Sequence, residues 1–210
     1  MKHFRLCILL FLLFPLSSFA DDVTFLPAPT LAKQKQTIDR IEEYLTNLTT
    51  IVSDFTQVAP NGDLTSGKFY LQRPGKMRWQ YNPPTPILMV SNGSELVYFD
   101  YELEQVSHIP LDSTLIGFLA ENPIRFDNKV GITGFEMQPG AIRITLAQAA
   151  KPGDGQLMLE FSDHPLLLRN MVVRDATNQV TTVSLNNAHF GLKLDESLFV
   201  FKDPRKGRRR

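Results

Sequence analysis

The stretch GKFYLQRPGKMRWQY, residues 67–81, decides the fold class of this chain. Apolar and aromatic side chains alternate with polar ones in both halves, and Pro74-Gly75 stands between the halves. Because successive side chains of a strand point to opposite faces, each half predicts a strand with one apolar face. Pro-Gly between two such runs is a turn signal. The stretch therefore predicts an antiparallel β-hairpin.

The same kind of pattern continues along most of the chain. Runs at residues 87–90, 95–100 and 105–109 follow at short spacing, and Asn92-Gly93 between the first two is a strong hairpin signal. Later runs of strand character lie at residues 132–137, 141–146, 157–161, 166–174, 180–185 and 198–201. Roughly ten or more short strands without an internal repeat predict one antiparallel sheet that is large enough to curl.

Two segments have helical character. Apolar residues recur at spacings of three and four over residues 38–48, which marks one apolar face of a helix. That helix could continue further, or a strand could begin near Thr50, and the periodicity allows both. Residues 111–120 predict a short apolar helix, with Asp112 or Ser113 as its N-terminal cap.

The N-terminus has the features of an export signal. Positive charges at Lys2 and Arg5 precede the apolar run 6–14, and Ser18-Phe19-Ala20 is a small-x-small cleavage site. The run is far shorter than the ~20 residues that a membrane helix needs. We therefore expect a signal peptide that is cleaved after Ala20. We expect no lipid on Cys7, because Arg-Leu precedes it instead of small residues.

The domain organisation follows from these patterns. After the signal peptide at residues 1–20, no linker divides residues 21–204, so we expect a single domain there. Its first ten residues, 21–30, hold two prolines and predict an extended arm. Residues 205–210, RKGRRR, form a basic tail, and such a charge run predicts a solvated segment.

Composition excludes several classes of function. Lys and Arg total 22 and Asp and Glu total 22, which argues against a nucleic-acid binder. The single cysteine lies in the signal segment, so the mature chain has no disulfide, thiolate metal site or cysteine nucleophile. His108, His164 and His189 are isolated in sequence and match no metal or nucleophile motif. We expect no metal, no cofactor and no enzyme activity.

The expected sheet has more apolar surface than one layer of helices needs. The runs at residues 69–71, 88–90 and 97–99 place apolar side chains on both faces. One account is an ordinary two-layer core. The other is a curled sheet around an apolar cavity that takes a hydrophobic ligand.

Several segments in order resemble the LolA family of periplasmic lipoprotein carriers. They are DFTQ at residues 54–57, the hairpin at 67–81, VSNGSELVYFD at 90–100 with EQV at 104–106, and LDESLFVFKDPR at 194–205. The likeness runs from about residue 35 to residue 205. It implies an unclosed antiparallel β-barrel covered by a helical lid, with an apolar cavity between them. It also favours a strand that begins near Thr50.

The resemblance implies a function as well as a fold. It implies a monomeric periplasmic chaperone that accepts acylated lipoproteins from an inner-membrane, ATP-driven release complex. The same chaperone would pass them to an outer-membrane lipoprotein acceptor. Two alternatives stay open: a lipid-sensing or scaffold module on the same fold, and an envelope hydrolase.

Site residues follow from the resemblance together with strand alternation. The family's Arg-Pro pair falls on Arg73-Pro74, and the resemblance implies that Arg73 hydrogen-bonds the lid when the protein is closed and empty. Phe69 and Leu71 share a strand face with Arg73, so they would point into the cavity with it. We assign further residues to the cavity, namely Met77, Trp79, Tyr81 and Met89. Ordinary core packing is the alternative for the residues that we assign to the underside of the lid, namely Leu115, Ile116, Phe118 and Leu119.

Overall fold

The structure is a computed structural model that describes residues 28–127 and 129–207. It has two α-helices, α1 (Ala28–Asn47) and α2 (Leu115–Phe118), in this part of the chain. Single 3-10 turns are η1 (Leu111–Ser113), η2 (Pro152–Asp154), η3 (Glu196–Phe199) and η4 (Pro204–Gly207). The strands are β1 (Thr50–Val58), β2 (Leu64–Gln72), β3 (Lys76–Tyr81), β4 (Ile87–Asn92), β5 (Glu95–Asp100), β6 (Gln105–Pro110), β7 (Val130–Gln138), β8 (Ala141–Gln148), β9 (Gly155–Ser162), β10 (Leu167–Asp175) and β11 (Val180–Phe190).

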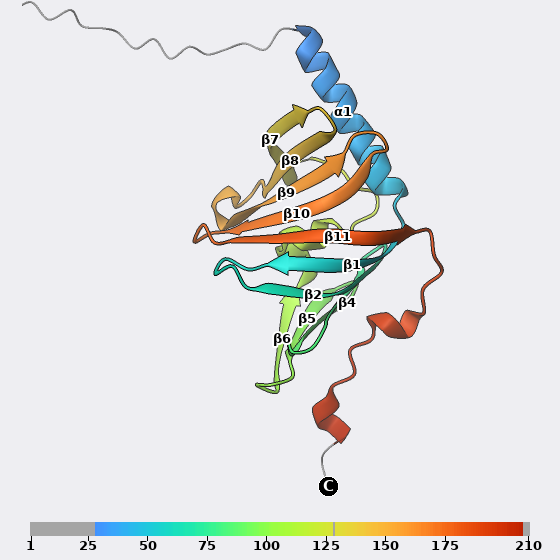
Figure 1. Ribbon diagram of the computed structural model, residues 1–210, viewed down its shortest axis with the longest axis vertical. Helices are drawn as coiled ribbons and strands as arrows, with labels where there is room; N and C mark the ends of the chain where they lie inside the picture. Colours follow the sequence, from blue (N-terminus) through green and yellow to red (C-terminus); the bar gives the residue numbers. More distant parts are fainter. Residues whose placement is uncertain (1–27, 128, 208–210) are drawn as a thin grey trace, which may run out of the picture.

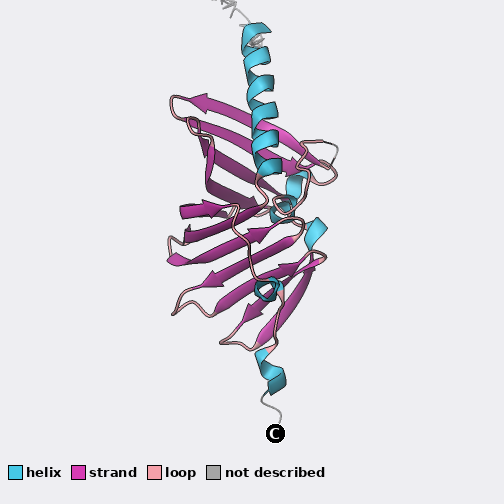
Figure 2. Cartoon of the chain, turned by 90° about the vertical axis from the view of Figure 1, so that its right-hand side faces the viewer, coloured by secondary structure: helices cyan, strands magenta, loops and turns pink. Residues whose placement is uncertain are grey.

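All of these strands form one antiparallel sheet. Its order is β6-β5-β4-β3-β2-β1-β11-β10-β9-β8-β7, so β1 lies at the centre and β6 and β7 are the two unpaired edges. Figures 1 and 2 show that the sheet curls without closing. The predicted curled antiparallel sheet, and the strand that begins at Thr50, are therefore confirmed.

The register of the paired strands places their alternating apolar side chains next to one another, on one continuous face of the sheet. In the β2–β3 hairpin Phe69 pairs with Trp79 and Leu71 pairs with Met77, so all four side chains point the same way. They share one buried cluster with residues of β8 and β9 on the other side of β1, such as Ile144. We call the face that carries this cluster the inner face, and the opposite one the outer face.

The helices pack on the inner face. In Figure 2, α1 runs along the upper half of the sheet, and Ile41 and Leu45 on its apolar side are fully buried in the main cluster. Polar contacts fix the same helix, because the Tyr44 hydroxyl accepts a hydrogen bond from the Leu168 N–H (3.1 Å). Most of the stability of such a helix comes from burying its apolar side.

A separate small core lies on the outer face. Leu88, Val90 and Phe99 form it, and Phe201 packs against them. Phe201 belongs to the segment that follows β11, which crosses the outer face of β3 and β4. We call this segment, residues 193–206, the C-terminal strap. The apolar residues on both faces are thus covered by two different parts of the chain.

Some sequence predictions about element boundaries are wrong. Helix α1 begins at Ala28, inside the predicted extended arm, because a proline is compatible with the first turn of a helix. Thr114 caps α2, its Oγ1 accepting the Gly117 N–H (3.0 Å), whereas Asp112 and Ser113 lie in η1. Residues 198–201 form no strand, since Leu198 and Phe199 lie in η3 and the two residues after it belong to no regular element.

The predictions about the signal peptide concern residues outside the described part of the chain. The signal peptide at residues 1–20 lies outside the described residues, as does residue 21, where the mature chain is expected to begin.

The first part of the predicted basic tail is described. Arg205 lies in η4 and donates a hydrogen bond to the Glu104 carbonyl (3.1 Å). No helix of the described residues is long and apolar enough to cross a membrane.

Candidate functional site: the apolar inner face and its buried arginine

A cluster of aromatic rings covers the inner face of β1–β3. Phe69 stacks on Trp79 with ring centroids 4.1 Å apart, and Phe55 packs edge-on against both Trp79 and Tyr81, at 5.0 Å each. Among the described residues of these three strands, no acidic side chain shares that face. This part of the inner face is therefore an apolar wall. It suits an apolar ligand and presents few hydrogen-bonding groups to it.

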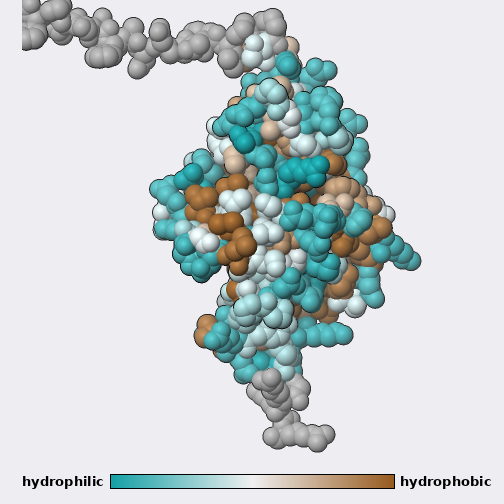
Figure 3. All heavy atoms as spheres, viewed as in Figure 1, coloured by the Kyte–Doolittle hydropathy of each residue, from teal (hydrophilic) through white to brown (hydrophobic). Residues whose placement is uncertain are grey.

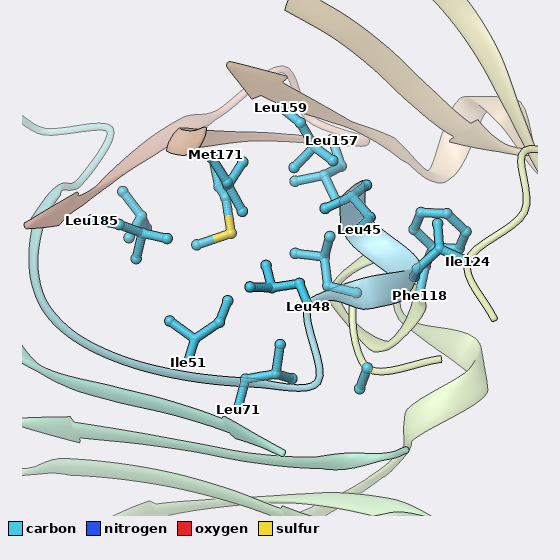
Figure 4. Close-up of a cluster of buried hydrophobic side chains, with 14 of the residues drawn as sticks. Leu45, Leu48, Ile51, Leu71, Phe118, Ile124, Leu157, Leu159, Met171 and Leu185 are labelled. Carbon is cyan, nitrogen blue, oxygen red and sulfur yellow. The ribbon is translucent and has the colours of Figure 1, made fainter. Parts of the chain in front are cut away.

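The six residues that we assigned to the cavity all lie on the inner face. Phe69, Leu71, Met77 and Trp79 are buried in the main cluster, while Tyr81 and Met89 are half-buried and pack against it. Met89 faces inward because it pairs with Trp79 across β3 and β4. Figure 4 shows how Ile51 and Leu71 on one wall face Met171 and Leu185 on the other. Their role in holding a ligand stays a prediction.

The residues assigned to the lid are of two kinds. Phe118 and Leu119 are buried, and Figure 4 shows Phe118 beside Ile124 and the end of α1. Leu115 and Ile116 are half-buried and border an apolar groove of about 380 Å³. The other wall of this groove comes from β8–β10 and includes Val173. The groove thus lies where α2 meets the second half of the sheet.

Hydrophobic surface also appears outside the core. Figure 3 shows brown patches on the left and right of a mostly teal surface, at the two ends of the central strands. A wider depression of about 890 Å³ lies beyond the β2–β3 turn, where Pro74, Ala120, Arg125 and Lys129 line it. Its mixed, charged lining does not suit an acyl chain, so we place the candidate site on the inner face.

Arg73 ties both helices to the sheet. Its Nε donates to the Leu119 carbonyl (2.7 Å) at the end of α2, and its Nη1 donates to the carbonyls of Leu45 and Leu48 (2.7 Å to the latter) at the end of α1. The last carbonyls of a helix have no partner within the helix and carry its negative dipole end. A buried cation is therefore well placed between the two helix ends.

Burial sets the ionisation of the groups around this arginine. It lowers the pKa of Arg73 to about 10, against a smaller opposing effect of Tyr44, so the guanidinium stays charged at neutral pH. It raises the pKa of Tyr44, and it raises the pKa of Tyr81 to about 12. Both phenols are therefore neutral and give Arg73 no negative partner. Because Arg73 is only 8% exposed, its positive charge needs polar groups of the protein to replace its contacts with water. Its carbonyl acceptors provide that compensation.

Sequence reasoning missed the second half of the inner face. Six side chains of β8 and β9 are fully buried there, namely Ile142, Ile144, Leu146, Leu157, Leu159 and Phe161. Their strict alternation with polar or outward-facing neighbours was a usable signal. It did not say which of the two faces would be inner, because that depends on how the sheet curls.

These features define a class of protein: an unclosed antiparallel barrel with two helices on an apolar inner face, both bonded to one buried arginine. A family model described as "Outer membrane lipoprotein carrier protein LolA" matches residues 46–202. The chain therefore belongs to the LolA family, as its sequence motifs indicated.

Similar proteins agree with this assignment. The outer-membrane lipoprotein carrier protein of Methylococcus capsulatus is 29% identical over 174 residues, which cover 79% of this chain and 83% of that protein. The protein of the same name from Bordetella avium is 30% identical, with 84% of this chain and 88% of that protein covered. An uncharacterized conserved protein from Thermus thermophilus matches in structure with a TM-score of 0.50 at 12% identity, covering 82% of this chain and 96% of that one, and shows the fold alone.

Proposed function

We propose that this protein is a periplasmic carrier that binds the acyl chains of lipoproteins released from the inner membrane and delivers them to the outer membrane. The observation that carries the proposal is the apolar inner face, covered by helices that a single buried arginine holds. Membership of the LolA family, with relatives named as lipoprotein carriers, supports it. We propose binding rather than catalysis.

The energetics of acyl chains explain why such a face is needed. Burying an acyl chain is worth about 0.8 kcal/mol per methylene, so an acylated lipoprotein does not cross water unaided. A carrier must cover these chains and also give them up. A smooth apolar wall meets both needs, since its interactions are non-directional and few polar groups anchor the ligand. Side chains of α1 and α2 pack in the same buried cluster as this wall, and we propose that the ligand takes their place.

The proposal includes the partners and the form of the protein. We propose that the mature chain begins after Ala20 and works as a monomer. It would receive lipoproteins from an ATP-driven release complex of the inner membrane and pass them to an acceptor in the outer membrane. Depletion separates this role from that of a lipid sensor. Loss of a carrier leaves lipoproteins in the inner membrane, whereas loss of a sensor changes gene expression first.

Binding of a triacylated lipopeptide to the purified mature protein tests the site. The emission of Trp79, the one tryptophan of the sequence, should change on binding because its ring lies on the inner face. Met89→Glu should weaken binding at least about tenfold, since a carboxylate among apolar walls is costly. Met89→Leu is the matched control and should bind like the wild type.

Two results would contradict the proposal. One is an unchanged affinity of a folded Met89→Glu protein, which would place the ligand away from the inner face. The other is the absence of any saturable binding of lipopeptide by the wild-type protein.

A further inference from the structure

Three polar side chains interrupt the apolar inner face at one end. They are Gln57 on β1, Thr65 on β2 and Tyr81 on β3. The Tyr81 hydroxyl donates to Oε1 of Gln57 (2.7 Å). Gln57 and Thr65 are directly opposite each other across β1 and β2, which places their Cβ atoms about 5 Å apart. The three groups therefore form one contiguous cluster.

The Thr65 hydroxyl is buried without a protein partner. Its Oγ1 has no hydrogen bond to any described residue. Other buried hydroxyls of the inner face are satisfied: Ser53 donates to the Asn186 carbonyl (2.8 Å) and Ser91 to the Gly75 carbonyl (2.8 Å). An unpaired buried hydroxyl is unfavourable, and native proteins hold few of them. The Thr65 hydroxyl is thus a hydrogen-bond donor without an acceptor among the described residues, and it lies on the face that we propose for the ligand.

Gln57 adds further donors beside it. Its Oε1 is occupied by Tyr81, and no acceptor for its amide nitrogen is found among the described residues. A primary amide nitrogen carries two N–H donors. All of the donors in the cluster are neutral, so they match a neutral acceptor such as an ester or amide carbonyl. A carboxylate, by contrast, would enter this apolar surrounding without a countercharge.

The position of the cluster suits one end of an acyl chain. Ile51 pairs with Leu71 at the other end of the strands, next to Arg73. The six residue steps from Ile51 to Gln57 span about 20 Å along β1. Between them lies the aromatic wall of Phe55, Phe69 and Trp79. A chain laid along this wall would have its carbonyl at the cluster and its methyl end near Arg73.

We propose that Thr65 and Gln57 form a subsite for the acyl carbonyl of the bound lipid. Thr65 Oγ1–H and the Gln57 amide donate hydrogen bonds to an ester or amide carbonyl, while Tyr81 holds the Gln57 side chain in place. The subsite gives the otherwise non-directional apolar wall a preferred orientation for the chain. This inference rests on the proposed function, because it takes an acyl chain on the inner face as given.

The test compares two lipopeptides that differ only in their carbonyls. One carries two ester-linked acyl chains, and the other carries two ether-linked alkyl chains of the same length. Wild-type protein should bind the ester form about fivefold more tightly, the effect of one net hydrogen bond of about 1 kcal/mol. Thr65→Val should remove most of that preference. Its stability should not fall, because the lost hydroxyl has no partner in the protein.

Thr50→Val is a matched control. The Thr50 hydroxyl is also buried without a partner, but Thr50 is on the outer face, one residue before Ile51 on β1. The same methyl-for-hydroxyl exchange should therefore leave the ester preference unchanged. Gln57→Met is a second variant, for which we expect the same loss of preference as for Thr65→Val.

Each outcome has a clear meaning. Equal affinity of wild type for the ester and ether forms overturns the subsite and leaves the carrier role intact, whereas failure to bind either form contradicts the carrier role itself. Loss of the ester preference in Thr50→Val, as in Thr65→Val, also overturns the subsite.

A diacyl phospholipid with the same chains identifies the source of the carbonyl. If its affinity also depends on Thr65, the subsite takes ester carbonyls of diacyl lipids in general, and if it does not bind, the subsite serves lipoproteins.

Discussion

The turn that follows Arg73 packs closely against two other parts of the fold. Gly75 has a φ of +77°, and a Cβ there would lie 2.5 Å from the Cα of Gly93. The turn therefore packs directly against the β4–β5 turn, which only a glycine permits. The Gly75 N–H also donates to the Ala120 carbonyl (2.7 Å) just beyond α2. Side chain and turn together bind the end of α2 to the sheet.

Arg73→Leu should convert the carrier into a protein that keeps its cargo. On the proposed function, the bonds of Arg73 to the helix ends would have to break when a ligand displaces the helices. By linkage, a group that favours the empty state lowers the affinity for cargo and so helps release. We expect the variant to load lipopeptide at least as well as wild type and to transfer it more slowly to purified acceptor. We also expect a loss of about 2 kcal/mol in the stability of the empty protein.

Arg78→Leu is the control for this experiment. Arg78 also donates to a main-chain carbonyl, that of Leu198 (3.1 Å), but it does so on the outer face. Its variant should transfer cargo at the wild-type rate. If the folded Arg73→Leu protein fails to load at all, then Arg73 contacts the donor of the cargo, and its bonds to the helix ends do not control release.

At the scale of elements, the C-terminal strap closes the outer face. Phe199 in η3 is 2% exposed, and Gln72 and Lys76 on the outer face both reach Glu196 at the start of the same turn. Ion pairs at exposed positions contribute little. The strap is therefore held chiefly by two aromatic side chains: Phe199, which is buried, and Phe201, which packs against the small core of Leu88, Val90 and Phe99.

Phe199→Ala should destabilise the protein strongly without affecting ligand binding. Removal of a buried phenylalanine costs about 3–5 kcal/mol. Val200, the next residue, is 54% exposed, so Val200→Ala should cost about 0.5 kcal/mol or less. Denaturant unfolding of the two variants measures this difference. Equal stability of both would show that the strap does not rest on Phe199, and weaker lipopeptide binding by folded Phe199→Ala would show that the strap acts on the inner face.

At the scale of the whole molecule, polar contacts at the surface and the buried phenols limit the pH range of stability. Hydrogen bonds from Lys68, Arg143 and Arg205 hold the pKa values of Asp54, Glu160 and Asp203 below their usual range, for Asp203 at about 2. These carboxylates stabilise the fold above the unfolded pKa near 4, and the contribution is lost as pH falls toward 2. Burial acts in the opposite direction on Tyr81, whose pKa rises to about 12.

The free energy of unfolding should therefore be highest on a plateau between about pH 5 and pH 9. Below pH 4 it should fall as the paired carboxylates are protonated. Above pH 10 it should fall again, because the unfolded chain ionises its tyrosines at a lower pH than the half-buried Tyr81 ionises in the folded protein. Unfolding in denaturant over a pH series measures the curve, and Tyr81→Phe should make the alkaline fall shallower. A variant curve that matches wild type above pH 10 would mean that Tyr81 does not contribute.

The sequence determined the local features of this protein. Strand alternation is a local property, so the hairpin of residues 67–81, most of the other strands and the shared face of Phe69, Leu71 and Arg73 followed from it. The resemblance to the LolA family added the arrangement of these strands as an unclosed barrel. One error arose where local signals compete, at α2, where Thr114 caps the helix although Asp112 and Ser113 are equally suitable residue types.

Only the tertiary structure decided which groups meet across the curled sheet. The carbonyls that Arg73 bonds lie more than 20 residues away in sequence, and Tyr44 meets Leu168 across more than 120. The strap returns over the outer face, so the apolar side chains on the two faces of the sheet belong to two separate cores. The unpaired hydroxyl of Thr65 has no sequence signal at all, because burial and a missing partner both depend on what the fold brings near. Such contacts depend on the curvature of the whole sheet, which no short stretch of residues encodes.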